Sequence, residues 1–159
     1  MTPLDVIRDF CAEQGLEAQV TGATVVISVP GTARQRVTVV LSAGDKYLRA
    51  ESFVARRPDE NHEAVYHWLL EQNSRLLMAS FRIDRFGDVY LGAALPVAWT
   101  STELLDSLLG IMVTTVDESF NVILELGFRS AIEREWSWRT SRGLDARNLD
   151  AFRHLFEKD

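Results

Sequence analysis

The chain has 159 residues, of which 47% are hydrophobic and 25% are charged, and its net charge is −6. These values are ordinary for a globular domain, and they exclude disordered, collagen-like and coiled-coil chains. A chain of this length buries roughly two-thirds of its unfolded surface, so it can form a core without a metal or a disulfide. The single cysteine, Cys11, excludes an intrachain disulfide.

The charge and the N-terminal residues bear on where the protein works. A net negative charge has the wrong sign for a dedicated nucleic-acid binder. The first residues lack the basic and apolar stretches of a secretion signal, and no window reaches the ~20 uninterrupted apolar residues of a membrane span. A lone cysteine is typical of a reducing compartment. We therefore expect a cytoplasmic protein with no nucleic-acid partner and no membrane partner.

One helix and three strands are predicted in the first third of the chain. Thr2 and Pro3 favour a helix start, because threonine can cap a helix and proline at its first position loses no needed N–H. Gly15 favours the end of this helix. Three segments rich in β-branched or alternating apolar residues follow, each bounded by turn residues: 24–29, 36–42 and 46–54.

A second helix, a hairpin and a long helix are predicted next. Asp59 or Asn61 can cap the second helix. Thr100 to Glu103 has the spacing of a capping box, which predicts a long helix that ends at Gly127. The strands of the hairpin are 77–83 and 89–95.

The last residues of the chain predict a helical tail, with a turn or short helix near Trp136 and a final helix that Asp145 can cap. The predicted order is therefore α-β-β-β-α-β-β-α plus this C-terminal tail, which is an α+β fold. Hairpin-length connections imply a mostly antiparallel sheet that helices cover on one face. We expect a single domain over 1–159, with its core at about 3–127 and a helical extension at about 128–159.

The sequence lacks the motifs of several common enzyme classes. Gly-x-Ser-x-Gly, the phosphate-binding loop and the dinucleotide-binding glycine pattern are absent. His62 and His67 stand at i and i+5, whereas a zinc protease helix needs i and i+4 so that both imidazoles project from one face. Cys11 cannot build a zinc site alone, and its apolar surroundings fit a buried hydrophobe. We therefore expect no enzyme, no catalytic residue, no cofactor and no metal.

Four carboxylates could serve as acid–base groups, and each has a simpler interpretation. Asp84 and Asp88 flank a predicted hairpin turn, where aspartate commonly accepts hydrogen bonds from nearby backbone amides. Glu133 and Glu135 alternate with arginines, a pattern more typical of solvated ion pairs than of a catalytic pair.

Two arginine-containing segments suggest binding. Trp136, Trp138 and Arg139 lie in an arginine-rich tail, and this combination is typical of binding hot spots and of stacking surfaces for single-stranded nucleic acid. Because the tail is nearly neutral, packing within the chain is favoured, followed by a protein interface and then by nucleic acid. Arg56 and Arg57 precede a helix start and could contact an anion or an acidic peptide. A solvated loop is the simpler interpretation of that pair.

Three stretches of the sequence are similar to a known family. They are FVARRPDENHEAVYHWLL at 53–70, DRFGDVYL at 84–91, and the block that runs from Ser119 through Asn121 to Glu135 and Trp136. On these stretches the chain resembles actinobacterial members of the YbjN-like family, which are described as bacterial sensory transduction regulators. The resemblance extends from about Leu4 to Leu155.

The resemblance implies a fold like that of type III secretion chaperones, which are small acidic homodimers that bind an extended segment of a partner without ATP. It implies no catalytic residue. We therefore expect a non-enzymatic regulatory or chaperone-like homodimer that binds an unknown protein in bacterial signalling or stress response. The alternative is a small anionic-ligand sensor, or an uncharacterised enzyme, that uses the Arg56–Arg57 loop. The expected partner contacts are Arg56, Arg57, Tyr66, Trp136, Trp138 and Arg139.

Overall fold

The computed structural model describes residues 1–34 and 36–157. Within these residues the chain forms four α-helices, two 3₁₀ helices and six strands. In chain order they are α1 (Pro3–Glu13), β1 (Glu17–Thr21), β2 (Thr24–Pro30), β3 (Arg36–Ala43), β4 (Tyr47–Ala55), α2 (His62–Asn73), β5 (Ser80–Ile83), β6 (Val89–Pro96), η1 (Val97–Trp99), α3 (Thr102–Gly127), α4 (Arg129–Ser141) and η2 (Arg147–Leu155).

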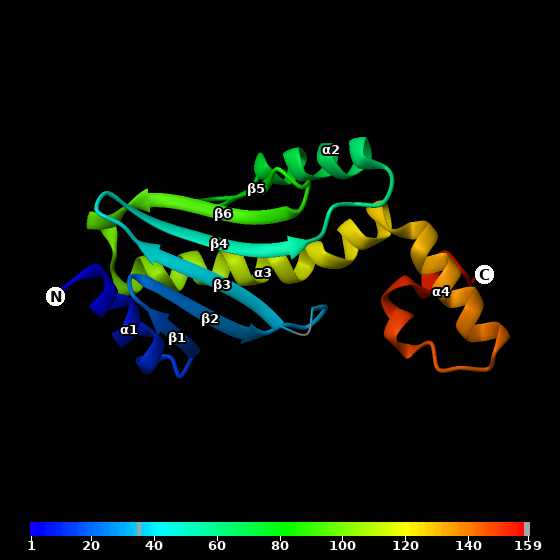
Figure 1. Cartoon of the computed structure of the whole chain (residues 1–159), viewed down its shortest axis with the longest axis horizontal. Helices are drawn as coiled ribbons and strands as arrows, with labels where there is room; N and C mark the ends of the chain where they lie inside the picture. The colour runs from blue at the N-terminus through cyan, green and yellow to red at the C-terminus, as the bar shows by residue number, and fades with distance from the viewer. Residues whose placement is uncertain (35, 158–159) are drawn as a thin grey trace.

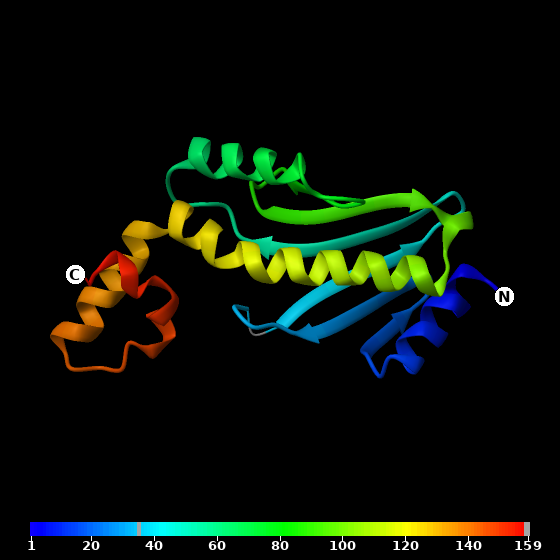
Figure 2. The ribbon, with the colours of Figure 1, turned by 180° about the vertical axis from the view of Figure 1, so that it is seen from behind.

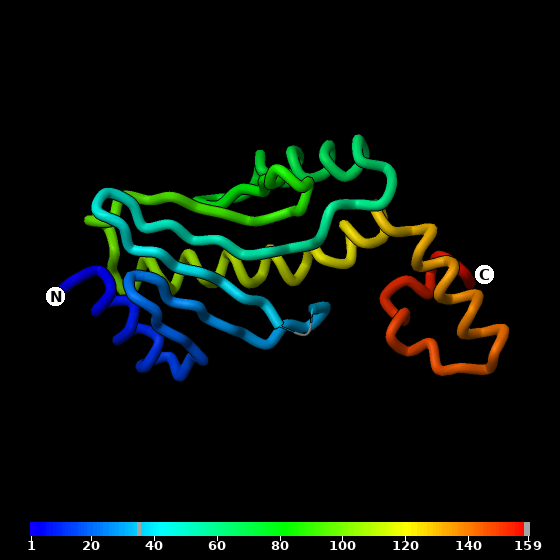
Figure 3. Tube along the Cα trace, viewed as in Figure 1, coloured from blue at the N-terminus to red at the C-terminus, as the bar shows by residue number. Residues whose placement is uncertain are grey.

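The six strands of the described residues form one antiparallel sheet in the order β1-β2-β3-β4-β6-β5. Figure 1 looks onto one face of this sheet, and Figure 2 shows α3 lying along the other face. α1 contacts α3 near β1, and α2 contacts both α3 and β5. The tube in Figure 3 shows that α1 and α4 lie at opposite ends of the molecule. The structure is an α+β fold with helices on one face of an antiparallel sheet, as predicted.

The core lies between the sheet and α3. Alternate residues of the central strands point inward and are buried, as Leu48, Ala50, Ser52 and Val54 are on β4. The buried residues of α3 recur every three or four positions and form one stripe that faces the sheet. By length and composition alone α3 could cross a membrane. In this fold its stripe packs on the strands, as in the core helix of a folded domain.

β1 is a strand that the sequence prediction lacks. Four of its five residues are exposed, so it shows none of the apolar alternation by which strands are recognised. It is an edge strand that joins β2 through the two-residue turn Gly22-Ala23. Gly22 has a φ of +59°, which a tight hairpin turn requires and glycine adopts without strain.

Two predicted boundaries are wrong by a few residues. Ser101 rather than Thr100 caps α3, because the Ser101 hydroxyl accepts from the backbone N–H of Leu104 at 3.2 Å. Glu103 is then the second residue of the helix and stands too early to complete a capping box. β5 begins at Ser80 rather than at residue 77, because Met78 has a φ of +64°, outside the strand region.

The loop before α2 holds the end of α3 and the start of α4. The carbonyl oxygen of Gly127 accepts from the backbone N–H groups of Asp59 (2.9 Å) and Glu60 (3.2 Å). The Glu60 carboxylate accepts from the backbone N–H of Ser130 at 2.6 Å, and this hydrogen bond lowers the pKa of Glu60. Asn61 precedes α2, but its side chain donates to a carbonyl of α3 rather than capping α2, so that part of the prediction is wrong.

The tail packs on the end of α3 in the same chain and forms a second, smaller apolar cluster. Trp136 of α4 stacks on Phe156, with ring centroids 4.7 Å apart. The predicted last helix is present as the 3₁₀ helix η2. The buried members of the cluster are Ile132, Leu149 and Phe152.

Two glycines of α3 lie in opposite surroundings and offer a matched pair of variants. A Cβ at Gly110 would meet nothing within 4 Å, whereas a Cβ at Gly127 would lie 2.8 Å from the Cβ of Pro58. We expect Gly110→Ala to raise the free energy of unfolding by about 1 kcal/mol, because alanine favours the helix. We expect Gly127→Ala to lower it by about 1–3 kcal/mol through overpacking. Urea unfolding measures both changes, and equal effects of the two variants would contradict the packing described for α3.

Candidate functional site

The face of the sheet seen in Figure 1 is uncovered by any helix among the described residues. The residues of β4 that alternate with its buried ones point outward on this face, and the half-exposed Tyr47 and Phe53 are the large ones among them. The register places Tyr90 of β6 opposite Phe53 and Arg82 of β5 opposite Tyr90. We call the following residues the open face: Tyr47, Arg49, Glu51, Phe53, Arg82 and Tyr90.

The open face contains one pair of aromatic side chains in contact with each other. The Phe53 and Tyr90 rings meet edge to face with centroids 5.5 Å apart, a favoured arrangement of aromatic pairs. Partial burial raises the pKa of the Tyr90 hydroxyl, and the nearby carboxylates of Asp84 and Asp88 raise it further. The Tyr90 hydroxyl is therefore neutral at ordinary pH.

A hollow of about 330 Å³ lies in the open face where β4, β6 and β5 run side by side. Arg82 reaches across β6 and pairs with Glu51 on β4. Gly92 makes this possible, because a Cβ there would lie 3.1 Å from the central carbon of the Arg82 guanidinium. Arg49 lines the same hollow.

An apolar groove of about 190 Å³ lies beside the open face, between α2 and the edge strand β5. Asn73 of α2 hydrogen-bonds the backbone of this edge strand. Its side chain accepts from the Phe81 N–H (2.6 Å) and donates to the Phe81 carbonyl (3.1 Å). The backbone of β5 is thus partly occupied, which disfavours addition of a further strand there. The side chains of α2 and β5 that line the groove can still contact a partner. We call this the edge groove, lined by Tyr66, Leu69, Leu70, Phe81, Arg82 and Ile83.

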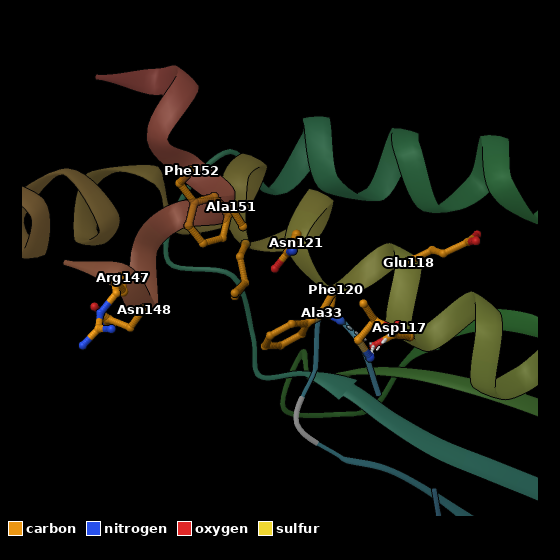
Figure 4. Close-up of a pocket in the computed structure, with 11 residues that line it drawn as sticks. Ala33, Asp117, Glu118, Phe120, Asn121, Arg147, Asn148, Ala151 and Phe152 are labelled. Atoms are coloured by element: carbon orange, nitrogen blue, oxygen red, sulfur yellow. Dashed lines mark hydrogen bonds between the residues drawn. The ribbon is translucent and has the colours of Figure 1, made fainter. Parts of the chain in front are cut away.

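A larger cavity of about 700 Å³ lies between the β2–β3 turn, α3 and η2. We call it the seam cavity, because residues of the sheet domain and of the tail both line it. Figure 4 shows Phe120 and Asn121 of α3 on one side of it and Asn148 and Phe152 of η2 on another.

The β2–β3 turn is held beside this cavity by one carboxylate. Asp117 of α3 accepts from the backbone N–H groups of Thr32, Ala33 and Arg34, at 2.9–3.0 Å. Gly31 is required for this approach, because a Cβ there would lie 2.1 Å from the Arg34 carbonyl oxygen. Asp117 therefore fixes the turn through main-chain N–H groups.

Arg34 connects the seam cavity to the open face. Its guanidinium donates to the carbonyl oxygens of Phe53 (2.6 Å) and Val54 (2.8 Å) at the end of β4. It also lies 5.4 Å from the ring centroid of Phe53 and 5.2 Å from that of Phe120. Burial lowers the pKa of Arg34. β3 and β4 diverge at this point (Figure 1). The Arg34 side chain donates to carbonyl oxygens of β4 there.

In the predicted Arg56–Arg57 loop, the Arg56 side chain is engaged within the chain and the Arg57 side chain is exposed. The Arg56 guanidinium pairs with both oxygens of Asp59 (2.7 and 3.2 Å) and lies 4.3 Å from the ring centroid of Phe128. The backbone N–H of Arg57 donates to Asp88 at 2.8 Å, and its side chain is exposed. The structure brings Tyr66 to the edge groove, away from these two arginines.

Of the predicted partner contacts in the tail, Trp136 packs inside the chain and Trp138 is exposed. Trp136 belongs to the second apolar cluster, and Arg139 pairs with Glu135 at 2.5 Å within α4. Trp138 is exposed beside Arg142, whose guanidinium lies 5.2 Å from its ring centroid. Of the three, Trp138 therefore presents its ring to a partner most directly.

Asp84, Glu133 and His62, among the candidate acid–base and metal-ligating residues, make contacts within the chain. Asp84 accepts from two backbone N–H groups of the β5–β6 turn, as predicted. Glu133 pairs with Arg129 four residues away, which confirms the solvated ion-pair interpretation. His62 hydrogen-bonds the Pro58 carbonyl at 2.7 Å, while His67 lies on the exposed side of α2. Residues 1–34 and 36–157 contain no cluster of side chains able to hold a metal ion.

Sequence reasoning found the strand that carries the open face but missed Arg34 and Asp117. Alternation on β4 predicts that Tyr47, Arg49, Glu51 and Phe53 share a side. The Asp117 contacts join residues more than 80 positions apart, which single-sequence patterns do not reveal. The one local signal is Pro30-Gly31, which marks the turn without showing what holds it.

Residues 3–125 match the YbjN family, whose description is "Putative bacterial sensory transduction regulator". An uncharacterized protein of Mycobacterium leprae, ML2442, is 44% identical over 135 residues, which are 85% of this chain and 73% of that protein. α4 and η2 lie beyond the residues that the family match covers.

Solved structures with a similar fold include the following two. The type III secretion chaperone SycH of Yersinia pestis, in complex with a stable fragment of YscM2, aligns with a TM-score of 0.53 and 20% identity over 72% of this chain and 97% of that chain. YbjN of E. coli, described as a "putative transcription regulator", aligns with a TM-score of 0.55 and 13% identity over 73% of this chain and 90% of that chain. The fold is thus similar to that of type III secretion chaperones.

The chain belongs to the YbjN family. The family and fold that the sequence resemblance implies are both confirmed.

Proposed function

We propose that this chain is a non-enzymatic, chaperone-like regulator that binds another protein through the open face. The observation that carries the proposal is a sheet face that combines exposed aromatic and arginine side chains and that no helix covers in the described residues. Aromatic residues and arginine are enriched at protein interfaces. The YbjN family and a fold shared with a chaperone that holds a protein fragment support the same role.

The second subunit of a homodimer would use the edge groove. Leu70 and Ile83 are exposed on either side of the groove, and neighbouring Leu77 is exposed as well. Apolar side chains gathered in this way typically mark an interface. Because Asn73 occupies part of the β5 backbone, the contact would rest on side chains rather than on an extended sheet.

The proposed setting is bacterial signalling or stress response in the cytoplasm, without a nucleic-acid or membrane partner. A net charge of −6 opposes binding to phosphate backbones and to anionic lipid surfaces. Of the six arginines of the tail, Arg129, Arg139 and Arg153 pair with carboxylates of their own helices, and Arg147 pairs with Asp145. They therefore add little positive potential to the surface.

A second candidate function, binding of a small ligand, has the seam cavity in its favour. A cavity of about 700 Å³ falls in the range of small-molecule sites, and its rings and carboxamides provide apolar walls with a few polar groups. This candidate replaces the Arg56–Arg57 loop as the place where a sensor would hold its ligand.

Affinity capture from the native host tests the main proposal with two variants matched in exposure. Tyr47 on the open face is 49% exposed, and Trp138 on the tail is 48% exposed. We expect the wild-type protein and Trp138→Glu to retain the same stoichiometric partner in mass spectrometry, and Tyr47→Glu to lose most of it. Loss in Trp138→Glu alone would move the binding surface to the tail. Equal retention in both variants would contradict a role for the open face.

Light scattering after size exclusion tests the dimer with a second matched pair. Ile83 in the edge groove is 46% exposed and Leu144 after α4 is 45% exposed. We expect a dimer for the wild-type protein and for Leu144→Lys, and a monomer for Ile83→Lys, because a buried unpaired charge opposes association. A wild-type monomer at high concentration would exclude this interface.

A thermal-shift screen of nucleotides and phosphorylated metabolites tests the ligand-sensor candidate. A ligand that binds only the folded state raises the melting temperature. We expect a ligand of the seam cavity to lose this effect in Asn121→Ala and to keep it in Arg57→Ala. The reverse result would return the site to the Arg56–Arg57 loop, and a screen without stabilisation would remove the candidate.

A further inference from the structure

The hollow in the open face is a positive site on an acidic protein. Arg49 and Arg82 border it with a single carboxylate, Glu51, whereas the whole chain has a net charge of −6. Small residues of β6, Gly92 and Ala94, lie between them. Because these residues project little from the sheet, a side chain of a partner can come close to the arginines.

One of the two arginines is already engaged. Arg82 pairs with Glu51, and its guanidinium lies directly over the bare backbone of Gly92. The opposite charges of Arg82 and Glu51 compensate each other. This leaves the charge of Arg49 uncompensated.

Arg49 is available to an incoming group. Among residues 1–34 and 36–157 its guanidinium has no carboxylate partner and donates no hydrogen bond. It lies 5.9 Å from the ring centroid of Tyr47, a contact that orients it without using its N–H donors. A guanidinium matches a carboxylate with two parallel hydrogen bonds. The hydroxyl of Ser80 borders the same hollow and adds a further donor.

We propose that this hollow binds the carboxylate of a single Asp or Glu side chain in the partner segment that lies across the open face. The inference rests on the proposed function and names the chemistry that the open face selects. Since the protein as a whole repels negative charge, a run of acidic residues would be disfavoured. The preferred partner segment has one acidic residue flanked by neutral residues.

An NMR titration of the ¹⁵N-labelled full chain tests this with three peptides. The probe is the acetylated and amidated octapeptide Ser-Thr-Val-Glu-Val-Thr-Ser-Gly, compared with versions that carry Gln or Lys in place of Glu. We expect the Glu peptide to shift the backbone N–H signals of Ser80, Gly92 and Ala94. We expect it to bind about tenfold more tightly than the Lys peptide, as for a paired charge at an interface.

Charge variants test the role of Arg49 itself. Arg49→Glu should reverse the preference so that the Lys peptide binds more tightly, and Arg49→Gln should remove the preference without reversing it. Arg8→Glu is the matched control, because Arg8 is exposed on α1 and the change in net charge is the same. It should leave the preference as in the wild type.

Four results would overturn the proposal. Equal binding of all three peptides at these signals would remove the carboxylate preference and leave the open face as a protein-binding surface. An equal effect of Arg8→Glu and Arg49→Glu would assign the preference to overall charge. Inorganic phosphate that binds these signals as tightly as the Glu peptide would make the hollow a small-anion site. If no peptide shifted these signals at millimolar concentration, the hollow would bind no carboxylate, and capture with Tyr47→Glu would still decide the proposed function.

Discussion

Helix α3 packs along the helical face of the sheet, and the positions of the other helices follow from that contact. Its buried stripe includes Leu105, Leu108 and Met112, and a fully buried side chain of this size contributes about 1.5–3 kcal/mol. α1, α2 and α4 each contact α3 rather than the opposite side of the sheet. With this apolar face satisfied, the sheet presents its second face to solvent, which is the physical origin of the open face.

α3 also holds the β2–β3 turn that borders the seam cavity. Asp117 holds the β2–β3 turn by its main chain, and Arg34 of that turn reaches the carbonyl oxygens at the end of β4. Phe120 of α3 and Phe53 of β4 lie on the two sides of its guanidinium. Arg34 therefore contacts both Phe120, which lines the seam cavity, and Phe53 of the open face. The tail adds its own apolar cluster where α3 ends.

Much of the fold could be predicted from the sequence, because local patterns specify it. Three features depend on neighbours a few positions apart: the apolar stripe of α3, the alternation of β4 and the cap at Thr2, whose hydroxyl accepts from Asp5 N–H at 3.2 Å.

β1 was not predicted because an exposed edge strand has no apolar face. The hollow was not predicted because Arg49, Arg82 and Glu51 meet only through strand register across β6. Tryptophan and arginine composition pointed instead to the tail, where Trp136 is largely occupied by internal packing.

The lone cysteine has a practical consequence for spectroscopy. Cys11 is buried in the core beside α3, and burial raises the pKa of its thiol. Since the thiolate is the reactive form, we expect Cys11 of the folded chain to react slowly with a maleimide dye. A cysteine placed on the open face would be labelled selectively without first removing the native one. Fluorescence or spin-label measurements of partner binding at the open face can therefore use the native background.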